Sequence, residues 1–388
     1  MIPGMHLAKS AFGIAAIVLT VGHLAGCAVS PPGTPEERPV MRGVEHNYAM
    51  VRVHFATDRL PLPSAELPER RFGNQRGDGG ILFGTADVSI PRDHRLGELE
   101  APSIWRLEFR EDPEKHVVVL AVDPQDRQEF IRSLRERIES SENGKAFIFV
   151  HGYNVSFGDA ARRTAQLHYD LGFAGAPLFY SWPSRSELLG YRDDETTVEW
   201  SIPHLKDFFS EVAQLVPAEG IYVIAHSMGN RPTSRALAEV FRDHPEYRPR
   251  FKEIILMAPD IDAEVFRAEI APALVAESQR VTLYASNRDL ALKVARSLHG
   301  RQRLGDADPH IVVIPGVESI DASAVETDLI GHSYYAEARS VLADLFDVVR
   351  DSGPAPRRRH LLEAVSEIGR FWRFRTPEAP PGELIGAR

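Results

Sequence analysis

The stretch 221–231, "IYVIAHSMGNR", constrains the fold of this chain more than any other. Residues 221–225 are apolar without interruption, which is typical of a parallel strand covered on both faces. The run stops before Ser227, whose neighbours two positions away, Ala225 and Gly229, are small enough for a sharp turn into a helix. Such a turn exposes the serine hydroxyl above the sheet, beside the amides of the helix N-terminus. The alternative is a serine that only caps the helix.

Short apolar runs alternate with amphipathic segments from about residue 46 to residue 350. We expect strands in "AMVRVHFA", "ADVSIP", "HVVVLAV", "AFIFV", "PLFYSW", "EIILMA", "RVTLYA" and "HIVVI", and helices in "DRQEFIRSLRERIES", "FGDAARRTAQLHYDL" and "HLKDFFSEVAQLV". This alternation predicts an α/β fold with a mainly parallel, doubly wound sheet and helices on both faces. Because the composition does not change within 46–350, the early strands are expected to extend the same sheet in one domain.

The overall charge excludes one class of function. Binding to nucleic acid needs a concentrated basic face, and the formal net charge of −10 argues against it. The sequence has neither the Cys/His spacing of a zinc site nor a phosphate-binding glycine loop, so it implies no metal and no organic cofactor. With 43% hydrophobic residues among 388, the chain has enough apolar material for a large globular domain.

Residues 1–27 are predicted to be a lipoprotein signal peptide. The apolar run at 11–21 is too short for a comfortable membrane span. It is followed by "LAGC", which ends at Cys27, the only cysteine, and resembles the bacterial lipobox, whose cysteine is lipidated. Residues 28–45 are polar and rich in proline, which indicates a flexible tether. By resemblance to sorting in Gram-negative bacteria, Ala28 favours the outer membrane, with the protein facing the periplasm. A plain secretory signal is the alternative.

Residues suited to catalysis come after several of the expected strands. They are "HGYN" at 151–154, Ser227, Asp260, Asp289 and His332. In open α/β sheets ligands bind at the carboxyl ends of the strands, so these residues are expected to meet. A serine hydroxyl needs a neighbouring base, and the base needs a carboxylate to fix its tautomer. The set therefore predicts a triad of Ser227, His332 and one of the two aspartates.

The same motifs carry a resemblance to a known family. The segments "ATDR" at 56–59, "HGYN" at 151–154, "AHSMGN" at 225–230, "APDID" at 258–262 and "GHSYY" at 331–335 resemble the α/β-hydrolase superfamily, in a bacterial branch of uncharacterised serine-hydrolase-like lipoproteins. The order Ser, Asp, His along the chain is that of this superfamily. One departure is Ala225, where glycine is usual. The motifs imply the α/β-hydrolase fold and a serine site, and they say little about the substrate.

The resemblance also implies roles for individual residues. The superfamily usually carries its acid after the second strand beyond the nucleophile, which favours Asp289 over Asp260, a residue that has helix capping as its alternative role. The backbone N–H groups of Tyr153 and Met228 are the implied oxyanion hole. The side chains of Tyr153 and Trp182 are candidate substrate-pocket residues, with aromatic packing as the alternative.

Two further histidines compete with His332 for the role of base. His226 is adjacent to Ser227, but successive side chains diverge at a sharp turn, so we expect it to pack behind the turn. His151 is expected to shape the "HGYN" loop through hydrogen bonds. The excursion at 184–203 is the expected pocket wall, and an open pocket without a large lid favours short or medium acyl esters.

The C-terminal residues 351–388 differ in character from the domain. They are basic, and Leu361, Val365, Ile368 and Trp372 share one face of a hypothetical helix. We expect an amphipathic helix that lies on an anionic membrane or docks on the domain, or else a disordered tail.

The sequence therefore predicts a lipid-anchored serine hydrolase that cleaves carboxylic esters. Amide and thioester hydrolysis use the same residues, so the leaving group is not determined. A rival interpretation is a catalytically silent hydrolase-fold lipoprotein that binds an envelope partner or ligand. The complete Ser, Asp and His set argues against it, and nothing in the sequence indicates an oligomeric state.

Overall fold

The computed structural model describes most of the chain from residue 47 onward. The described ranges are 47–103, 108–141, 144–186, 190–217, 220–275, 280–325, 335–351 and 353–375. The predicted signal peptide and tether, including Cys27, and the predicted base His332 lie outside them. His46–Arg388 form one compact unit with its own hydrophobic cores, which cover both faces of the sheet.

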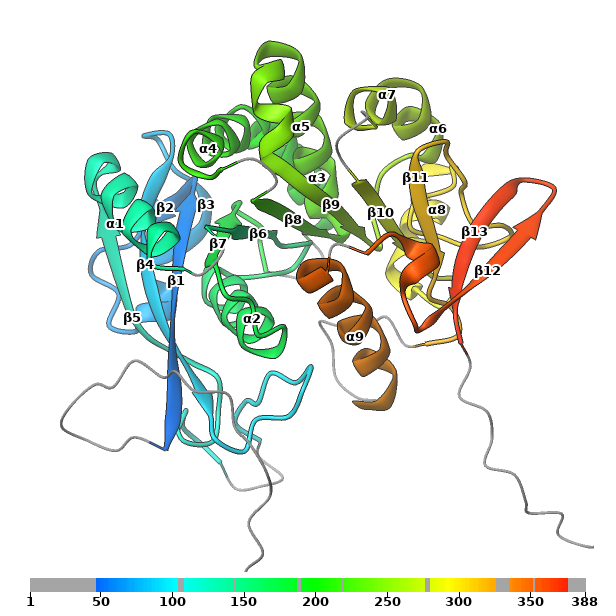
Figure 1. Ribbon diagram of the computed structural model, residues 1–388. Coiled ribbons are helices and arrows are strands. Elements are labelled where there is room, and N and C mark those ends of the chain that lie inside the picture. Colours follow the sequence, from blue (N-terminus) through cyan, green and yellow to red (C-terminus); the bar gives the residue numbers. More distant parts are fainter. Residues whose placement is uncertain are drawn as a thin grey trace, which may run out of the picture. The chain divides into compact units, whose positions relative to one another are not determined.

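A single large sheet organises this unit (Figure 1). Its strands are β1 (Tyr48–Thr57), β4 (Leu82–Pro91), β5 (Val118–Gln125), β6 (Ala146–Val150), β7 (Ala176–Ser181), β8 (Ile221–His226), β9 (Phe251–Met257), β10 (Arg280–Ala285), β11 (Val317–Asp321), β12 (Leu361–Ser366) and β13 (Gly369–Phe374). The spatial order is β12-β13-β11-β10-β9-β8-β6-β7-β1-β4-β5. Pairing is parallel from β1 through β13 and antiparallel only at the two edges. The mainly parallel sheet is confirmed, and the early strands extend it as expected. A separate hairpin pairs β2 (Arg59–Pro61) with β3 (Phe72–Arg76).

Helices cover both faces of the sheet (Figure 1). They are α1 (Arg127–Glu139), α2 (Phe157–Asp170), α3 (Tyr191–Trp200), α4 (Ile202–Leu215), α5 (Asn230–Asp243), α6 (Ala263–Val265), α7 (Ala271–Leu274), α8 (Leu290–His299) and α9 (Tyr335–Asp351). Apolar side chains of α1, α4, α5 and α7 pack into one core, while those of α2 and α9 pack into the other. No helix in the described ranges is long and apolar enough to span a bilayer.

Helix α2 begins and ends where the sequence predicts. Ser156 accepts a hydrogen bond from the Asp159 N–H, and the Asp159 carboxylate in turn accepts from the Ser156 N–H, which completes a capping box. Gly172 adopts a left-handed φ of 52° just after the last turn, a conformation that glycine enters without steric cost. Local capping chemistry thus fixes both ends of the helix that follows the "HGYN" loop.

The last central strand was placed wrongly by the sequence pattern. The run 310–314 is not a strand, and the strand is β11, a few residues later. Ile311, Val312 and Ile314 are buried all the same, and the Ser319 hydroxyl of β11 donates to the Val312 carbonyl. An apolar run predicts burial, and burial was achieved here by packing rather than by pairing in the sheet.

The C-terminal segment is also different from the expectation. Residues 361–374 form the hairpin β12–β13, not a helix, and β13 adds to the sheet beside β11. Leu361, Trp372 and Phe374 are buried, whereas Val365 is exposed, so the inward positions alternate as in a strand. The open edge of β11 supplies backbone hydrogen-bonding groups that the segment satisfies as a strand, and this outweighs the helical spacing of its apolar residues.

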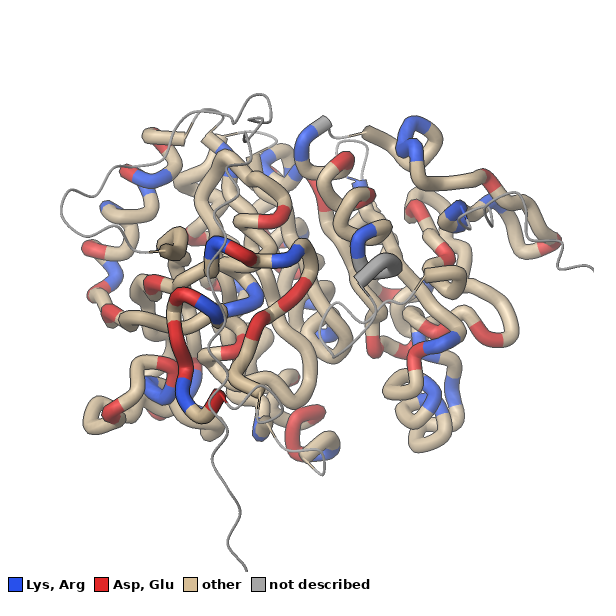
Figure 2. The backbone as a smooth tube through the Cα atoms, turned by 90° about the horizontal axis from the view of Figure 1, so that it is seen from below, with Lys and Arg blue, Asp and Glu red and all other residues tan. Residues whose placement is uncertain are grey.

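Charges are mixed over the surface rather than segregated. On the side seen in Figure 2, Lys and Arg are interleaved with Asp and Glu along the chain. On this side, the described residues therefore form no single basic region of the kind that nucleic-acid binding requires.

One buried histidine predicts a pH-dependent stability. The Nδ1 of His94 lies 2.8 Å from a Glu100 carboxylate oxygen and its Nε2 lies 2.8 Å from Asp170 at the end of α2. Burial alone lowers the pKa of His94, but the hydrogen bonds to Asp170 and Glu100 outweigh it and raise the pKa to about 9. The charged ring therefore stabilises the folded state fully below about pH 6.5, and this contribution is lost as the pH rises through 9.

Urea unfolding at pH 6 and above pH 9 measures this effect. We expect the wild-type free energy of unfolding to fall by roughly 3 kcal/mol across this range. The variant His94→Gln has no ionisable ring and is expected to show a much smaller change. An equal pH dependence in both proteins would assign the effect to other groups.

Candidate active site

Ser227 occupies a strained turn between β8 and α5. Its φ is 49°, in the left-handed region that residues other than glycine rarely adopt. The side chain of Ser227 caps neither the short turn Ser227–Gly229 nor α5. Its carbonyl accepts hydrogen bonds from the Asp260 N–H at 3.2 Å and from the Asn230 side chain at 2.9 Å. The backbone is thus held in place from two sides, and the serine is not the ordinary helix cap that the sequence left as an alternative.

The "HGYN" loop lies directly against this turn. A Cβ added at Gly152 would come within 2.9 Å of the Ser227 Cβ and 2.8 Å of the His226 Nδ1. A Cβ added at Gly229 would come within 2.2 Å of the His151 carbonyl oxygen. Only glycine permits this approach of the two backbones. The implied oxyanion hole requires this contact between the loop and the turn. Its donors, the N–H groups of Tyr153 and Met228, stay a prediction.

The variant Gly229→Ala is expected to destabilise the protein because the new methyl group meets backbone atoms of His151 that cannot rotate away. We expect a loss of about 3 kcal/mol in the free energy of unfolding, measured in urea. Gly79→Ala is the matched control, since a Cβ there meets no atom within 4 Å. Equal stability of the two variants would show that the turn and the loop do not touch.

His151 supports the loop and is not a base. Its Nδ1–H donates to the Gly152 carbonyl at 2.8 Å, and its Nε2 accepts from the Ser181 hydroxyl and from Arg59. Burial and the Arg59 charge lower the pKa of His151 well below its ordinary value. The ring stacks on Trp182, whose indole N–H donates to the His151 carbonyl at 2.8 Å. Trp182 is fully buried and takes part in aromatic packing, while its role in the substrate pocket stays a prediction.

Arg59, in the "ATDR" motif, is a functional neighbour that the sequence did not predict. It is fully buried and donates to the Ser181 hydroxyl at 2.8 Å and to the Val155 carbonyl at 2.8 Å, just beyond the "HGYN" loop. Burial lowers the pKa of Arg59 to about 10, against the opposing charges of Asp58 and Asp194. A buried arginine looks like a surface residue in sequence, and the motif itself was the only signal for it.

The surroundings of His226 do not suit a role in proton transfer. Its Nδ1 is buried and has no hydrogen-bond partner among the described residues. Burial of the ring, with a contribution from Arg163, lowers the pKa of His226 to about 3. The neutral ring packs against Gly152 behind the turn, in the position expected from the sequence.

The two candidate acids have different surroundings. Asp260 is buried, and its carboxylate binds Arg303 at 2.6 Å, Arg231 at 3.1 Å and the hydroxyl of Tyr191 at 2.6 Å. Burial raises the pKa of Asp260, but the two arginines outweigh it and hold the pKa below its usual value. The helix-cap role proposed as its alternative belongs instead to Asp262. Asp260 is thus committed to an ion-pair network.

Asp289 is partly exposed and follows β10, as the triad acid should. One carboxylate oxygen accepts from the Leu292 N–H at 2.9 Å and so caps α8. The second oxygen is not needed for this cap. Since His332 lies outside the described residues, the pairing of Asp289 with it stays a prediction.

Helix α3 lies in the excursion at 184–203 and contacts the turn at Ser227–Gly229, while its expected role as a pocket wall stays a prediction. The ring of its first residue, Tyr191, packs edge-on against Tyr153 at 5.5 Å between centroids. Tyr191 also contacts Arg231 of α5, and Arg231 pairs with Glu195 of α3. An aromatic pair and a charged network therefore border the turn on this side.

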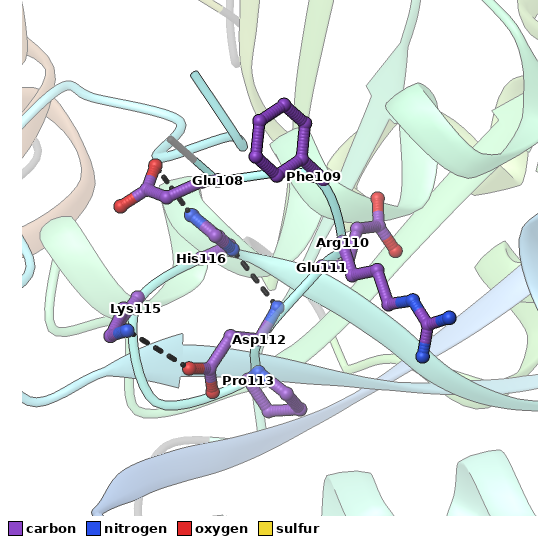
Figure 3. Close-up of a pocket in the computed structure, with 8 residues that line it drawn as sticks. All are labelled: Glu108, Phe109, Arg110, Glu111, Asp112, Pro113, Lys115 and His116. Atoms are coloured by element: carbon purple, nitrogen blue, oxygen red, sulfur yellow. Dashed lines mark hydrogen bonds and ion pairs between the residues drawn. The ribbon is translucent and has the colours of Figure 1, made fainter. Parts of the chain in front are cut away.

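A surface pocket elsewhere in the fold is separate from the site at Ser227 (Figure 3). It has a volume of about 560 Å³ and is formed by residues 108–116 alone. Some of its polar groups pair within the segment: the Asp112 N–H donates to His116 Nδ1, and His116 Nε2–H donates to Glu108. Glu111 instead pairs with Arg162 of α2. The segment precedes β5 at the far edge of the sheet, and four strands separate β5 from β8. No group of three or more His, Cys, Asp or Glu that could hold a metal occurs within the described ranges.

A match to a family model assigns the chain to a protein family. Residues 126–349, more than half of the sequence, match the family described as "Alpha/beta hydrolase of unknown function (DUF900)". The chain belongs to this family. The matched part of this α/β hydrolase runs from α1 to α9 and includes the turn at Ser227, the "HGYN" loop and both candidate acids. The strands β1 to β5, with Arg59, lie outside the match.

Other comparisons are more distant. The "Uncharacterized protein alr1448" of Nostoc sp. is 43% identical over 51 residues, which cover 13% of each chain. Solved structures with similarity to this α/β hydrolase include a predicted CIB-like hydrolase from Thermoplasma acidophilum (15% identity, TM-score 0.30, 54% of this chain and 88% of that one). Lipase B from Aspergillus fumigatus is another (13% identity, TM-score 0.37, 66% and 63%). These scores are low, so the family match alone supports the assignment.

Proposed function

We propose that this α/β hydrolase is a serine hydrolase that cleaves carboxylic esters. The observation that carries the proposal is the left-handed φ of 49° at Ser227, at the end of a buried parallel strand. Strain of this kind is retained where the surrounding structure enforces it, and at a strand-to-helix turn it presents a hydroxyl for nucleophilic attack. The place of Asp289 after β10, the second strand beyond the strand that leads to Ser227, supports it as the acid.

The proposed reaction follows the general course of acyl transfer. Ser227 Oγ attacks the ester carbonyl while His332 takes its proton, and Asp289 holds the imidazole and stabilises its charge. The N–H groups of Tyr153 and Met228 stabilise the oxyanion. The alkoxide leaves with the proton from His332, and water, activated by the same histidine, releases the acid from Ser227. No metal or cofactor takes part in these steps.

The aromatic pair suggests the kind of acyl group. Tyr153 and Tyr191 border the turn, so they would contact an acyl chain or alcohol bound to Ser227. We propose short or medium acyl esters as substrates, as the sequence led us to expect.

A fluorophosphonate probe tests the proposal, because it reacts with a serine that a base and an oxyanion hole activate. We expect mass spectrometry to locate the label on Ser227 and labelling to disappear in His332→Ala. A folded protein that takes up no label would favour the rival interpretation, a silent hydrolase-fold lipoprotein that binds an envelope partner.

We further propose that Cys27 is lipidated and that residues 28–45 tether the domain to the outer membrane, on the periplasmic side. Labelled fatty acid should be incorporated by the wild type and not by Cys27→Ser. Incorporation by both proteins would contradict the lipobox.

A further inference from the structure

Helix α8 carries an exposed apolar stripe. Leu290, Val294 and Leu298 are 75%, 60% and 53% exposed, respectively. They are four residues apart, so they lie along one face of the helix. The opposite face is already used, because Leu292 and Ala295 are buried against the domain. The exposed stripe is therefore additional to what the fold needs.

Two cations, Arg288 and Lys293, accompany this stripe, together with one acid, Asp289, which caps the helix. Residues 290–305 contain no Asp or Glu, and they include Lys293, Arg296 and Arg301. Arg296 pairs with Asp306 and Asp308, and Arg301 pairs with Glu264, but no acidic partner of Lys293 is found within the described part of the chain. Arg288, just before the helix, is exposed and has no acidic partner there either. Apolar residues flanked by cations are typical of a helix that lies in the interface of an anionic membrane.

We propose that α8 docks on an anionic phospholipid surface, with Leu290, Val294 and Leu298 inserted among the acyl chains and Lys293 and Arg288 near the headgroups. A second copy of the chain fits this patch less well. A stable protein–protein interface buries about 1,600 Å² in total, far more than three side chains on one ten-residue helix provide. Arg288 and Lys293 would also face the same cations of the second copy across a symmetric contact, which is repulsive.

The docking helix adjoins the candidate active site. Asp289 caps its N-terminus, and His299 at its C-terminus pairs with Glu195 of α3 and packs near Tyr191. A membrane bound to α8 would thus lie beside the wall of the site. The docking itself does not depend on hydrolysis, so it is tested separately from the proposed function.

Vesicle binding by residues 46–388, the compact unit, tests the proposal without the predicted lipid anchor. Vesicles of phosphatidylcholine and phosphatidylglycerol in equal parts should bind the protein, and added salt should weaken the binding. Replacing Leu290, Val294 and Leu298 together by serine should weaken binding at least about tenfold. Ser227→Ala should bind like the wild type, which separates docking from catalysis.

A fluorescent label reports whether the helix enters the bilayer. Residues 46–388 contain no cysteine, so Val294→Cys gives a single site for an environment-sensitive dye. Its emission should increase and shift to shorter wavelength with anionic vesicles. Phe109→Cys is the matched control, because Phe109 is 77% exposed near the opposite edge of the sheet.

Three outcomes would overturn the proposal. The first is no binding to anionic vesicles, or equal binding to pure phosphatidylcholine. The second is a dye response at residue 109 as large as that at residue 294. The third is a dimer, measured by light scattering, that the triple serine variant dissociates, because the stripe would then serve a second copy of the chain.

Discussion

Ser227→Ala is expected to reduce the hydrolysis of acyl esters at least about ten-thousand-fold. The substitution removes the oxygen that forms the acyl intermediate, and the remaining groups can only bind and polarise the ester. The measurement is kcat/KM on p-nitrophenyl esters of increasing chain length. The free energy of unfolding should be nearly unchanged, because the side chain of Ser227 caps no helix and alanine keeps the same left-handed backbone.

A second serine provides the control for this experiment. Ser210 is half-buried in α4 and its hydroxyl bonds only to the Lys206 carbonyl of its own helix. Ser210→Ala should leave kcat/KM unchanged. Full activity in Ser227→Ala would remove the proposed nucleophile and with it the mechanism.

Asp289→Asn and Asp260→Asn are expected to damage different properties of the protein. Asp289→Asn should lower kcat about ten-thousand-fold, since an amide no longer holds the catalytic histidine in the correct tautomer. Its stability should change little, because asparagine caps α8 about as well as aspartate does. Asp260→Asn should instead destabilise the protein by about 3–5 kcal/mol, since Arg231 and Arg303 lose their shared carboxylate.

The two variants are compared by kcat on the same ester and by urea unfolding. Below the unfolding transition, Asp260→Asn should retain far more activity than Asp289→Asn. The reverse ranking of kcat, with Asp260→Asn folded, would reassign the acid to Asp260. A large loss of stability in Asp289→Asn would point to a structural role for that carboxylate beyond the cap.

The interpretation of the sequence succeeded where local chemistry and burial coincide. The apolar run at 221–225 is a central parallel strand, and the small residues after it allow the turn at Ser227. The capping box at Ser156 sets the start of α2 without help from the rest of the fold. In these cases each residue's requirement is met by neighbours within a few positions, so a one-dimensional pattern contains it.

The interpretation of the sequence failed where a segment packs or pairs with a partner that is distant along the chain. The run at 310–314 is apolar because it is buried, but the strand that pairs with β10 comes later. The apolar spacing in 361–372 fits a helix, yet the free edge of β11 makes the segment a strand. The basic amphipathic helix that was expected in the tail is found instead in α8, whose exposed stripe only the tertiary structure reveals.

The sequence by itself determined the α/β fold, the sharp turn at Ser227 and the candidates for base and acid. Strand burial and turn size depend on residues that are close in the chain, and the order of the candidates can be read directly from the sequence. Only the tertiary structure decided that Arg59 supports the "HGYN" loop together with His151 and that Asp260 belongs to an ion-pair network. Those contacts join residues that are far apart in the chain. Their energies depend on burial and on distances of about 3 Å, which no linear pattern specifies.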